Sequence, residues 1–207
     1  MRKIALFLVC IIFLSVSSQL ISQETKSISQ SRKDNTMELL NYRFKGGYYA
    51  FEKLFNQTVM YPQMAIGNCV VGISIISFRV NCEGDVYDVK NKTPLGYGID
   101  NEISIFFSET AGHWNSCNDD KYTKFEVPIQ FLLTGTETNT DDALLIVEAD
   151  NPGFICNGDE YYINKIEKYL SKGKYKRAIP YIDIMMRRDP YNTHYYDLKK
   201  KAVNGGE

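Results

Sequence analysis

The sequence predicts an α+β fold: a small domain with a three-stranded antiparallel sheet and two helices, followed by a C-terminal α-helical hairpin. Apolar and polar residues alternate over 72–80 and again over 124–133, which is typical of half-buried strands. Apolar residues recur at helical spacing over 162–169. The 207 residues, 44% apolar and 24% charged, suffice for one or two domains with a buried core.

The first strand and its turn are the clearest local signal. One face is predicted to carry Ser74, Ile76, Phe78 and Val80, and the other Ile73, Ile75, Ser77 and Arg79. The turn Asn81-Cys82-Glu83-Gly84 follows, in which Gly84 can adopt the positive φ that a tight hairpin needs. The β-rich pattern resumes at Val86, so we expect an antiparallel partner strand there.

A helix and a third strand complete the predicted domain. After the turn-rich residues 93–98, Asp100 is expected to cap a helix that ends before Gly112. This helix is expected to bury Ile103, Phe106 and Phe107. The strand 124–133 is predicted from the alternation of Phe125, Val127, Ile129, Phe131 and Leu133.

Together these residues resemble the TonB C-terminal domain family over roughly residues 44–133. The matching positions are Gly46-Gly47, Tyr61-Pro62, Ala65, Gly72, Phe78, Val80, Gly84, Val86, Ile99-Asp100, Glu102, Trp114, Val127-Pro128-Ile129 and Phe131. Ser104 departs from the small apolar residue usual in the helix, and Asn115-Ser116 replaces a frequent Lys-Pro pair. The resemblance implies a non-catalytic periplasmic module, linked to transmembrane transport, that binds an extended segment of an outer-membrane transporter or another envelope protein by β-strand addition.

Under this resemblance, we expect the backbone of the third strand to form the partner-binding edge, through Phe125, Glu126, Val127, Ile129, Gln130 and Phe131. Pro128 favours an edge position but also removes one hydrogen-bond donor. The apolar side chains of this strand are expected in the core, so the main chain would supply the binding groups.

Residues 1–22 are typical of a secretory signal peptide. Arg2 and Lys3 precede an apolar stretch from Ile4 to Leu14, which is shorter than the ~20 residues of a membrane span. We therefore expect a periplasmic protein without a span after cleavage; an inner-membrane anchor formed by an uncleaved N-terminus is the alternative. Residues 23–43 are polar and contain no proline, which predicts a flexible leader.

Charge divides the C-terminal part of the chain. Residues 134–160 hold seven acidic and no basic residues, which predicts an acidic connector over 134–158. Its apolar run, 143–147, fits either a short strand or a helical turn. Residues 161–201 hold eleven Lys or Arg against four acidic residues, yet the net charge of −1 argues against general nucleic-acid binding.

The predicted helical region, 159–207, has a signature of its own. Its spacings resemble one tetratricopeptide repeat over 159–192, at Tyr162, Tyr169, Gly173, Tyr175, Ala178, Ile182 and Asp189-Pro190. A third helix is expected near Leu198. One repeat cannot bury its apolar face alone, so the region should pack on the first domain or on another chain. In one interpretation, the helical region serves only to complete the fold. In the alternative, the protein is an envelope scaffold, and its basic repeat recruits an acidic partner.

Four cysteines lie beyond the predicted signal peptide: Cys69, Cys82, Cys117 and Cys156. In an oxidising compartment they allow two disulfides, in any of three connectivities. We expect at least one bridge, because Cys82 in a turn and Cys117 in a loop should be accessible.

The sequence predicts no catalytic, cofactor or metal site. Neither His113 nor His194 belongs to a nucleophile or carboxylate motif, and no Cys-x-x-Cys is present. Gly96-Tyr97-Gly98 lacks the further glycine and lysine of a phosphate-binding loop. We therefore predict a binding protein and not an enzyme.

Overall fold

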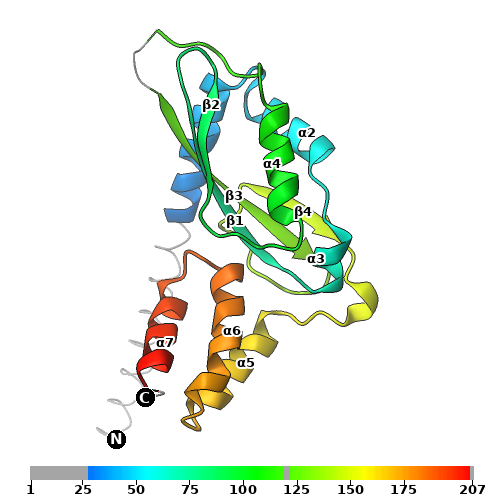
Figure 1. Ribbon diagram of the computed structural model, residues 1–207, viewed down its shortest axis with the longest axis vertical. Coiled ribbons are helices and arrows are strands. Elements are labelled where there is room, and N and C mark those ends of the chain that lie inside the picture. The colour runs from blue at the N-terminus through cyan, green and yellow to red at the C-terminus, as the bar shows by residue number, and fades with distance from the viewer. Residues whose placement is uncertain (1–27, 119–121, 206–207) are drawn as a thin grey trace, which may run out of the picture.

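The computed structural model describes residues 28–118 and 122–205, and it shows a mixed α+β protein (Figure 1). Its named elements are α2 (Gly47–Thr58), α3 (Gln63–Gly67), β1 (Gly72–Val80), β2 (Val86–Asn91), α4 (Ile99–Glu109), β3 (Thr123–Leu133), β4 (Leu145–Ala149), η1 (Pro152–Phe154), α5 (Asp159–Leu170), α6 (Tyr175–Arg188) and α7 (Thr193–Asn204). The sheet shares one core with α2 and α4, while α5–α7 enclose a second, smaller core below it in Figure 1.

The sheet has four strands in the order β2-β1-β3-β4. β1 pairs antiparallel with β2 and β3, whereas β4 pairs parallel with β3 from Ile129↔Leu145 to Leu133↔Ala149. The prediction of three strands was therefore incomplete. The fourth comes from the expected acidic connector, because Leu145 and Val147 alternate with more exposed residues and are buried against the core.

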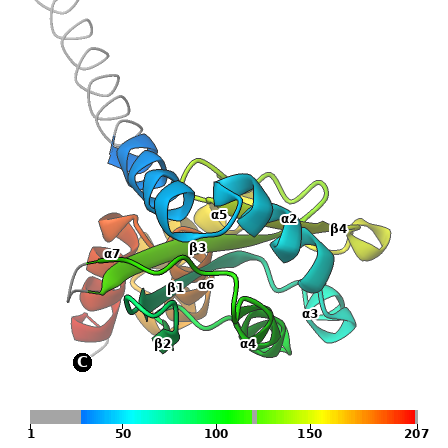
Figure 2. The same ribbon diagram turned by 90° about the horizontal axis from the view of Figure 1, so that it is seen from above.

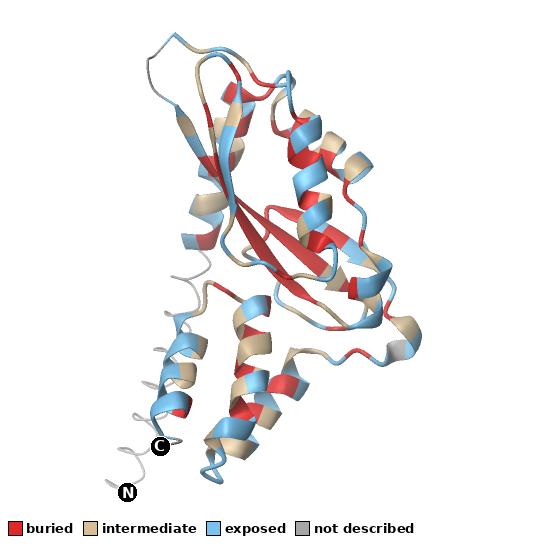
Figure 3. Ribbon diagram, in the orientation of Figure 1, coloured by how far each residue is buried: buried red, intermediate tan, exposed pale blue. Residues whose placement is uncertain are grey.

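β1 is buried on both faces, although its alternation predicted a half-buried strand. Figure 3 shows β1 and β3 as the most deeply buried part of the sheet. Ile76, Phe78 and Val80 face the main core, while Ile73 and Ile75 are buried on the opposite face. The end of α6 lies so close that a Cβ on Gly72 would be 2.5 Å from the carbonyl oxygen of Arg187.

Aromatic side chains fill the main core. Phe106 of α4 meets Phe51 and Phe55 of α2 edge to face, and Phe107 contacts Phe78 of β1. Trp114 is buried beside Phe78. The predicted buried face of the helix is confirmed, because Ile103, Phe106 and Phe107 are all buried.

The start of α4 differs from the prediction. Its N-cap is Gly98, with φ of 90°, and not Asp100. Asp100 lies inside the first turn, where its carboxylate accepts hydrogen bonds from Gly96 N at 2.9 Å and Asn91 Nδ2 at 2.6 Å. The acidic side chain therefore ties the preceding loop to the helix.

Residues 28–43 are helical, which corrects the expected flexible leader over that range (Figure 2). The helix buries Leu40, and Thr36 Oγ1 donates to the carbonyl of Glu126 in β3. The guanidinium of Arg43 is buried and donates to Thr123 Oγ1 and to the carbonyls of Asn81 and Asn115. These contacts hold the helix against the sheet domain, although its polar sequence predicted a flexible segment.

The expected signal peptide, residues 1–22, and the rest of the leader up to residue 27 lie outside the described residues. Within 28–118 and 122–205, the longest apolar stretches of helix are too short or too polar for a bilayer crossing.

The C-terminal region forms a helical hairpin, α5 and α6, with the expected third helix α7. Ala178, Ile182 and Ala202 are fully buried between them. Arg188 is also buried, and its guanidinium bonds Asp159 at 2.7 Å and stacks 4.6 Å over the ring of Tyr162. This buried ion pair joins the end of α6 to the start of α5.

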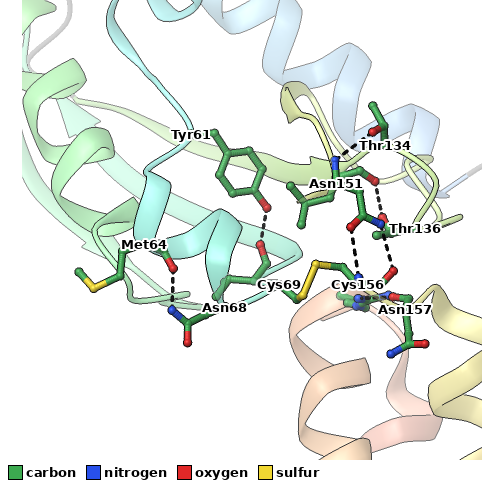
Figure 4. Close-up of a disulfide and its surroundings, with 12 residues drawn as sticks. Tyr61, Met64, Asn68, Cys69, Thr134, Thr136, Asn151, Cys156 and Asn157 are labelled. Atoms are coloured by element: carbon green, nitrogen blue, oxygen red, sulfur yellow. Dashed lines mark hydrogen bonds between the residues drawn. A yellow bond between two sulfur atoms is a disulfide. The ribbon is translucent and has the colours of Figure 1, made fainter. Parts of the chain in front are cut away.

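The four cysteines of the described residues form two disulfides, Cys69–Cys156 and Cys82–Cys117. The first joins the turn before β1 to the segment before α5 (Figure 4). The second joins the β1–β2 turn to the loop after Trp114.

Candidate functional site

The strand expected to bind a partner is not at the sheet edge. β3 lies between β1 and β4 in the sheet: it pairs with β1 from Thr123 to Phe131 and with β4 from Ile129 to Leu133. The expected edge role is therefore corrected for Ile129, Gln130 and Phe131, whereas Phe125, Glu126 and Val127 precede the pairing with β4. On the side away from β1, the carbonyl of Glu126 accepts from Thr36 and that of Pro128 accepts from Leu144 N. Pro128 lies where β4 joins the sheet, and its missing N–H leaves the antiparallel ladder to β1 intact.

The apolar side chains of β3 lie where expected. Phe125, Val127, Ile129 and Phe131 are at most 1% exposed and belong to the main core. Gln130 is fully buried on the other face, where its amide donates to Asn139 O. None of these side chains is available to a ligand in this arrangement.

The exposed edge next to β1 is β2. Lys92 N donates to Ile75 O, and Ile75 N donates to Thr93 Oγ1, so the odd-numbered residues of β1 direct their backbone groups toward β2. Val86 and Asn91 pair with the even-numbered Val80 and Ile76. Their own N–H and C=O groups therefore point away from β1, toward the open side of the sheet.

A groove of about 550 Å³ lies between this edge and α4. Its apolar lining comes from Ile76, Val86 and Val89 of the sheet and from Ile103 and Phe107 of the helix. Polar and small residues complete it: Gly84, Asp85, Asn91, Asp100, Ser104, Ser108, Ala111 and Gly112. The helical members repeat every three or four residues, which is the spacing of one face of a helix.

The opposite face of β2 carries charge. The carboxylate of Asp88 bonds Lys90 Nζ at 2.6 Å and Arg79 Nε at 3.4 Å, and the hydrogen bond from Lys90 lowers the Asp88 pKa. Asp88 has φ of 54° and lies where the register of β2 against β1 shifts. A bulge and charged side chains are common protections of an edge strand against unspecific pairing. A ligand at this edge must therefore match an irregular register.

The groove is lined by apolar, hydroxyl and amide side chains and by two carboxylates, Asp85 and Asp100. Neither His113, which stacks on Phe44 at 5.8 Å, nor His194, in the first turn of α7, is among the lining residues of the groove. In the described part of the chain, no three His, Cys, Asp or Glu side chains gather as a metal site would require. Both carboxylates of the groove have hydrogen-bond partners of their own. Asp100 accepts from Gly96 N and Asn91 Nδ2, whereas Asp85 accepts from Asn81 Nδ2.

The sequence reasoning missed this site, although one signal was available. Ser104 departs from the small apolar residue expected there, and it lines the groove. Val89 was part of the predicted partner strand. That it lies on the same groove as Phe107 depends on how α4 crosses the sheet, which the local sequence does not show.

Comparisons with known proteins return little. No protein-family model and no curated protein matches the chain. Among solved structures, it is similar to the NMR solution structure of the Helicobacter pylori TonB-CTD (residues 179–285), with 18% identity and a TM-score of 0.33 over 39% of this chain and 74% of that one. A TM-score of 0.33 is too low to carry an argument about function. The resemblance to a tetratricopeptide repeat finds no counterpart in these comparisons.

Proposed function

We propose that the protein is a non-catalytic binding module of the cell envelope, which captures an extended segment of a partner protein at the β2 edge. The observation that carries this proposal is the position of outward-facing backbone groups beside an apolar groove. Main-chain hydrogen bonds would supply affinity, and side chains entering the groove would supply specificity.

The dimensions suit a short strand. β2 has six residues, which span roughly 20 Å at the rise of an extended chain. An added strand would bond the backbone of Val86 and Asn91. Because side chains of a strand alternate, every second residue of the segment would enter the groove against Val89, Ile103 and Phe107. Small or medium apolar residues at these alternate positions fit its lining.

The sequence resemblance to the TonB C-terminal domain favours an outer-membrane transporter as the partner and a link to transmembrane transport. The two disulfides favour an oxidising compartment, which agrees with a periplasmic location. The proposed site is at β2, whereas β3 was the strand first expected to bind. The side of β3 that faces away from β1 contacts β4 and residues 28–43.

An NMR titration tests the proposal. Isotope-labelled protein lacking residues 1–22 is titrated with peptides from the periplasmic N-termini of outer-membrane transporters of the same cell. We expect shifts at the amides of Val86, Val89 and Asn91 and along the groove face of α4. Shifts confined to β4 or to α5–α7, or none with every peptide, would reject strand addition at β2.

A further inference from the structure

The far end of the C-terminal helices forms a second surface. α5 ends at Leu170, α6 begins at Tyr175, and α7 ends at Asn204. The end of α7 abuts the start of α6, since a Cβ on Gly205 would lie 3.1 Å from the ring of Tyr175. Three helix ends therefore meet on one side of the molecule. Figure 1 shows this end at the bottom of the long axis, with β2 and α4 at the top.

Positive charge is concentrated on these three ends. The basic end, as we call it, consists of Lys168, Lys172, Lys174, Lys176, Arg177, Lys200 and Lys201. All of these residues are exposed, and within 28–118 and 122–205 none of them forms an ion pair. Glu167 is the single acidic residue over 161–182. In a chain with a net charge of −1, this is a marked local excess.

We propose that the basic end docks on the surface of a membrane that contains anionic phospholipids. Exposed lysine and arginine side chains are attracted to such a surface, and their contributions add when they reach it together. Because the helix ends project in one direction, a plane of headgroups can meet all of them at once. The grooves lined by β2 and α4, by β3 and residues 28–43, and by residues 35–42 lie elsewhere on the molecule. The basic end carries its charge on projecting helix ends, which suits a flat anionic surface.

Docking of the basic end would orient the rest of the molecule on the membrane. With the basic end on the membrane, the β2–α4 groove lies at the opposite end of the long axis, away from the lipid. The membrane contact is independent of peptide capture, and either can fail without the other.

Vesicle co-sedimentation tests the proposal. Residues 23–207, the processed chain that the sequence predicts, are mixed with vesicles of equimolar phosphatidylglycerol and phosphatidylcholine, or of phosphatidylcholine alone, at rising sodium chloride. The variant Lys172→Glu/Lys176→Glu reverses two positive charges of the basic end. Lys53→Glu/Lys124→Glu is the matched control, because both lysines are exposed on the sheet domain and the net charge changes equally. Fluorescence of the buried Trp114 reports that each variant is folded.

We expect binding to the anionic vesicles alone, weakening with salt. Loss of two surface lysines should weaken it at least about 30-fold in the basic-end variant, and far less in the control. Equal loss in both variants would show a net-charge effect and overturn the proposal, as would unchanged binding of the basic-end variant. Failure to bind vesicles, together with binding to polyglutamate that Lys172→Glu/Lys176→Glu abolishes, would assign this surface to an acidic protein instead.

Discussion

Cys69 and Cys156 join two parts of the fold that lie 87 residues apart in the sequence. Cys69 is in the turn between α3 and β1, where its N–H bonds Ile66 O. Cys156 precedes α5 and is held on both sides of its backbone by the side chain of Asn151 (Figure 4). The disulfide therefore attaches the C-terminal helices to the sheet domain.

Replacing both residues, Cys69→Ser/Cys156→Ser, should lower the free energy of unfolding by about 2–5 kcal/mol, because a long loop is released in the unfolded chain. Urea denaturation measures this loss. The control Cys82→Ser/Cys117→Ser opens a loop of 35 residues. Only the first variant should also speed amide hydrogen exchange in α5 and α6. Equal exchange in the two variants would argue against the attachment role.

Gly72 marks the closest approach of the helical region to the sheet. Gly72→Ala would place a Cβ 2.5 Å from Arg187 O, a backbone atom that cannot turn away. We expect a loss of about 1–3 kcal/mol in unfolding free energy, the usual cost of overpacking. Gly67→Ala is the control, because its Cβ would meet nothing within 4 Å. A neutral Gly72→Ala would mean that α6 moves freely against β1.

Val89 and Tyr87 lie on opposite faces of the proposed binding edge, so substitutions at the two positions distinguish the faces. Val89 lines the groove, while Tyr87 contacts Tyr122 on the charged face, and their exposed fractions are similar at 45% and 38%. Val89→Asp should weaken peptide binding about tenfold or more, since a buried valine contributes about 1.5–3 kcal/mol. Tyr87→Asp should leave affinity nearly unchanged. Calorimetric titration with the peptide found by NMR measures both, and the reverse order would place the ligand on the other face.

Asp189, between α6 and α7, should make stability depend on pH. Burial raises the pKa of its carboxyl above the usual value, the charges of Asp142 and Asp159 add to this, and the hydrogen bond from Asn192 opposes it. Between the usual pKa of an aspartate and this raised pKa, the folded protein thus holds a proton that the unfolded chain has already released. The contribution of Asp189 to stability is full at low pH and is lost as pH rises through the raised pKa.

Asp189→Asn should therefore flatten the fall in unfolding free energy as pH rises above the usual pKa of an aspartate. Urea denaturation across that range measures the slope. Asp197→Asn provides the control, because Asp197 is exposed. Identical slopes in the two variants would exclude Asp189 as the origin of the pH dependence.

The core strands and helices were predictable because their signals are local. The alternation in β1 and β3, the positive φ of Gly84 and the apolar face of α4 all follow from residues within a few positions of one another. Residues 28–43 were not predictable as an ordered helix. Their stability depends on Arg43 and Thr36 reaching residues about 80 to 90 positions away.

The sequence by itself determined β1, β2, β3, α4 and the helices α5–α7, together with the core side chains of β3 and α4, since periodicity reports the burial of side chains. Only the tertiary structure decided which strand is an edge, because β3 shows the same alternation whether or not β4 pairs with its backbone. It also chose among the disulfide pairings and formed the β2–α4 groove. Each of these depends on long-range packing, which brings together groups that no local pattern connects.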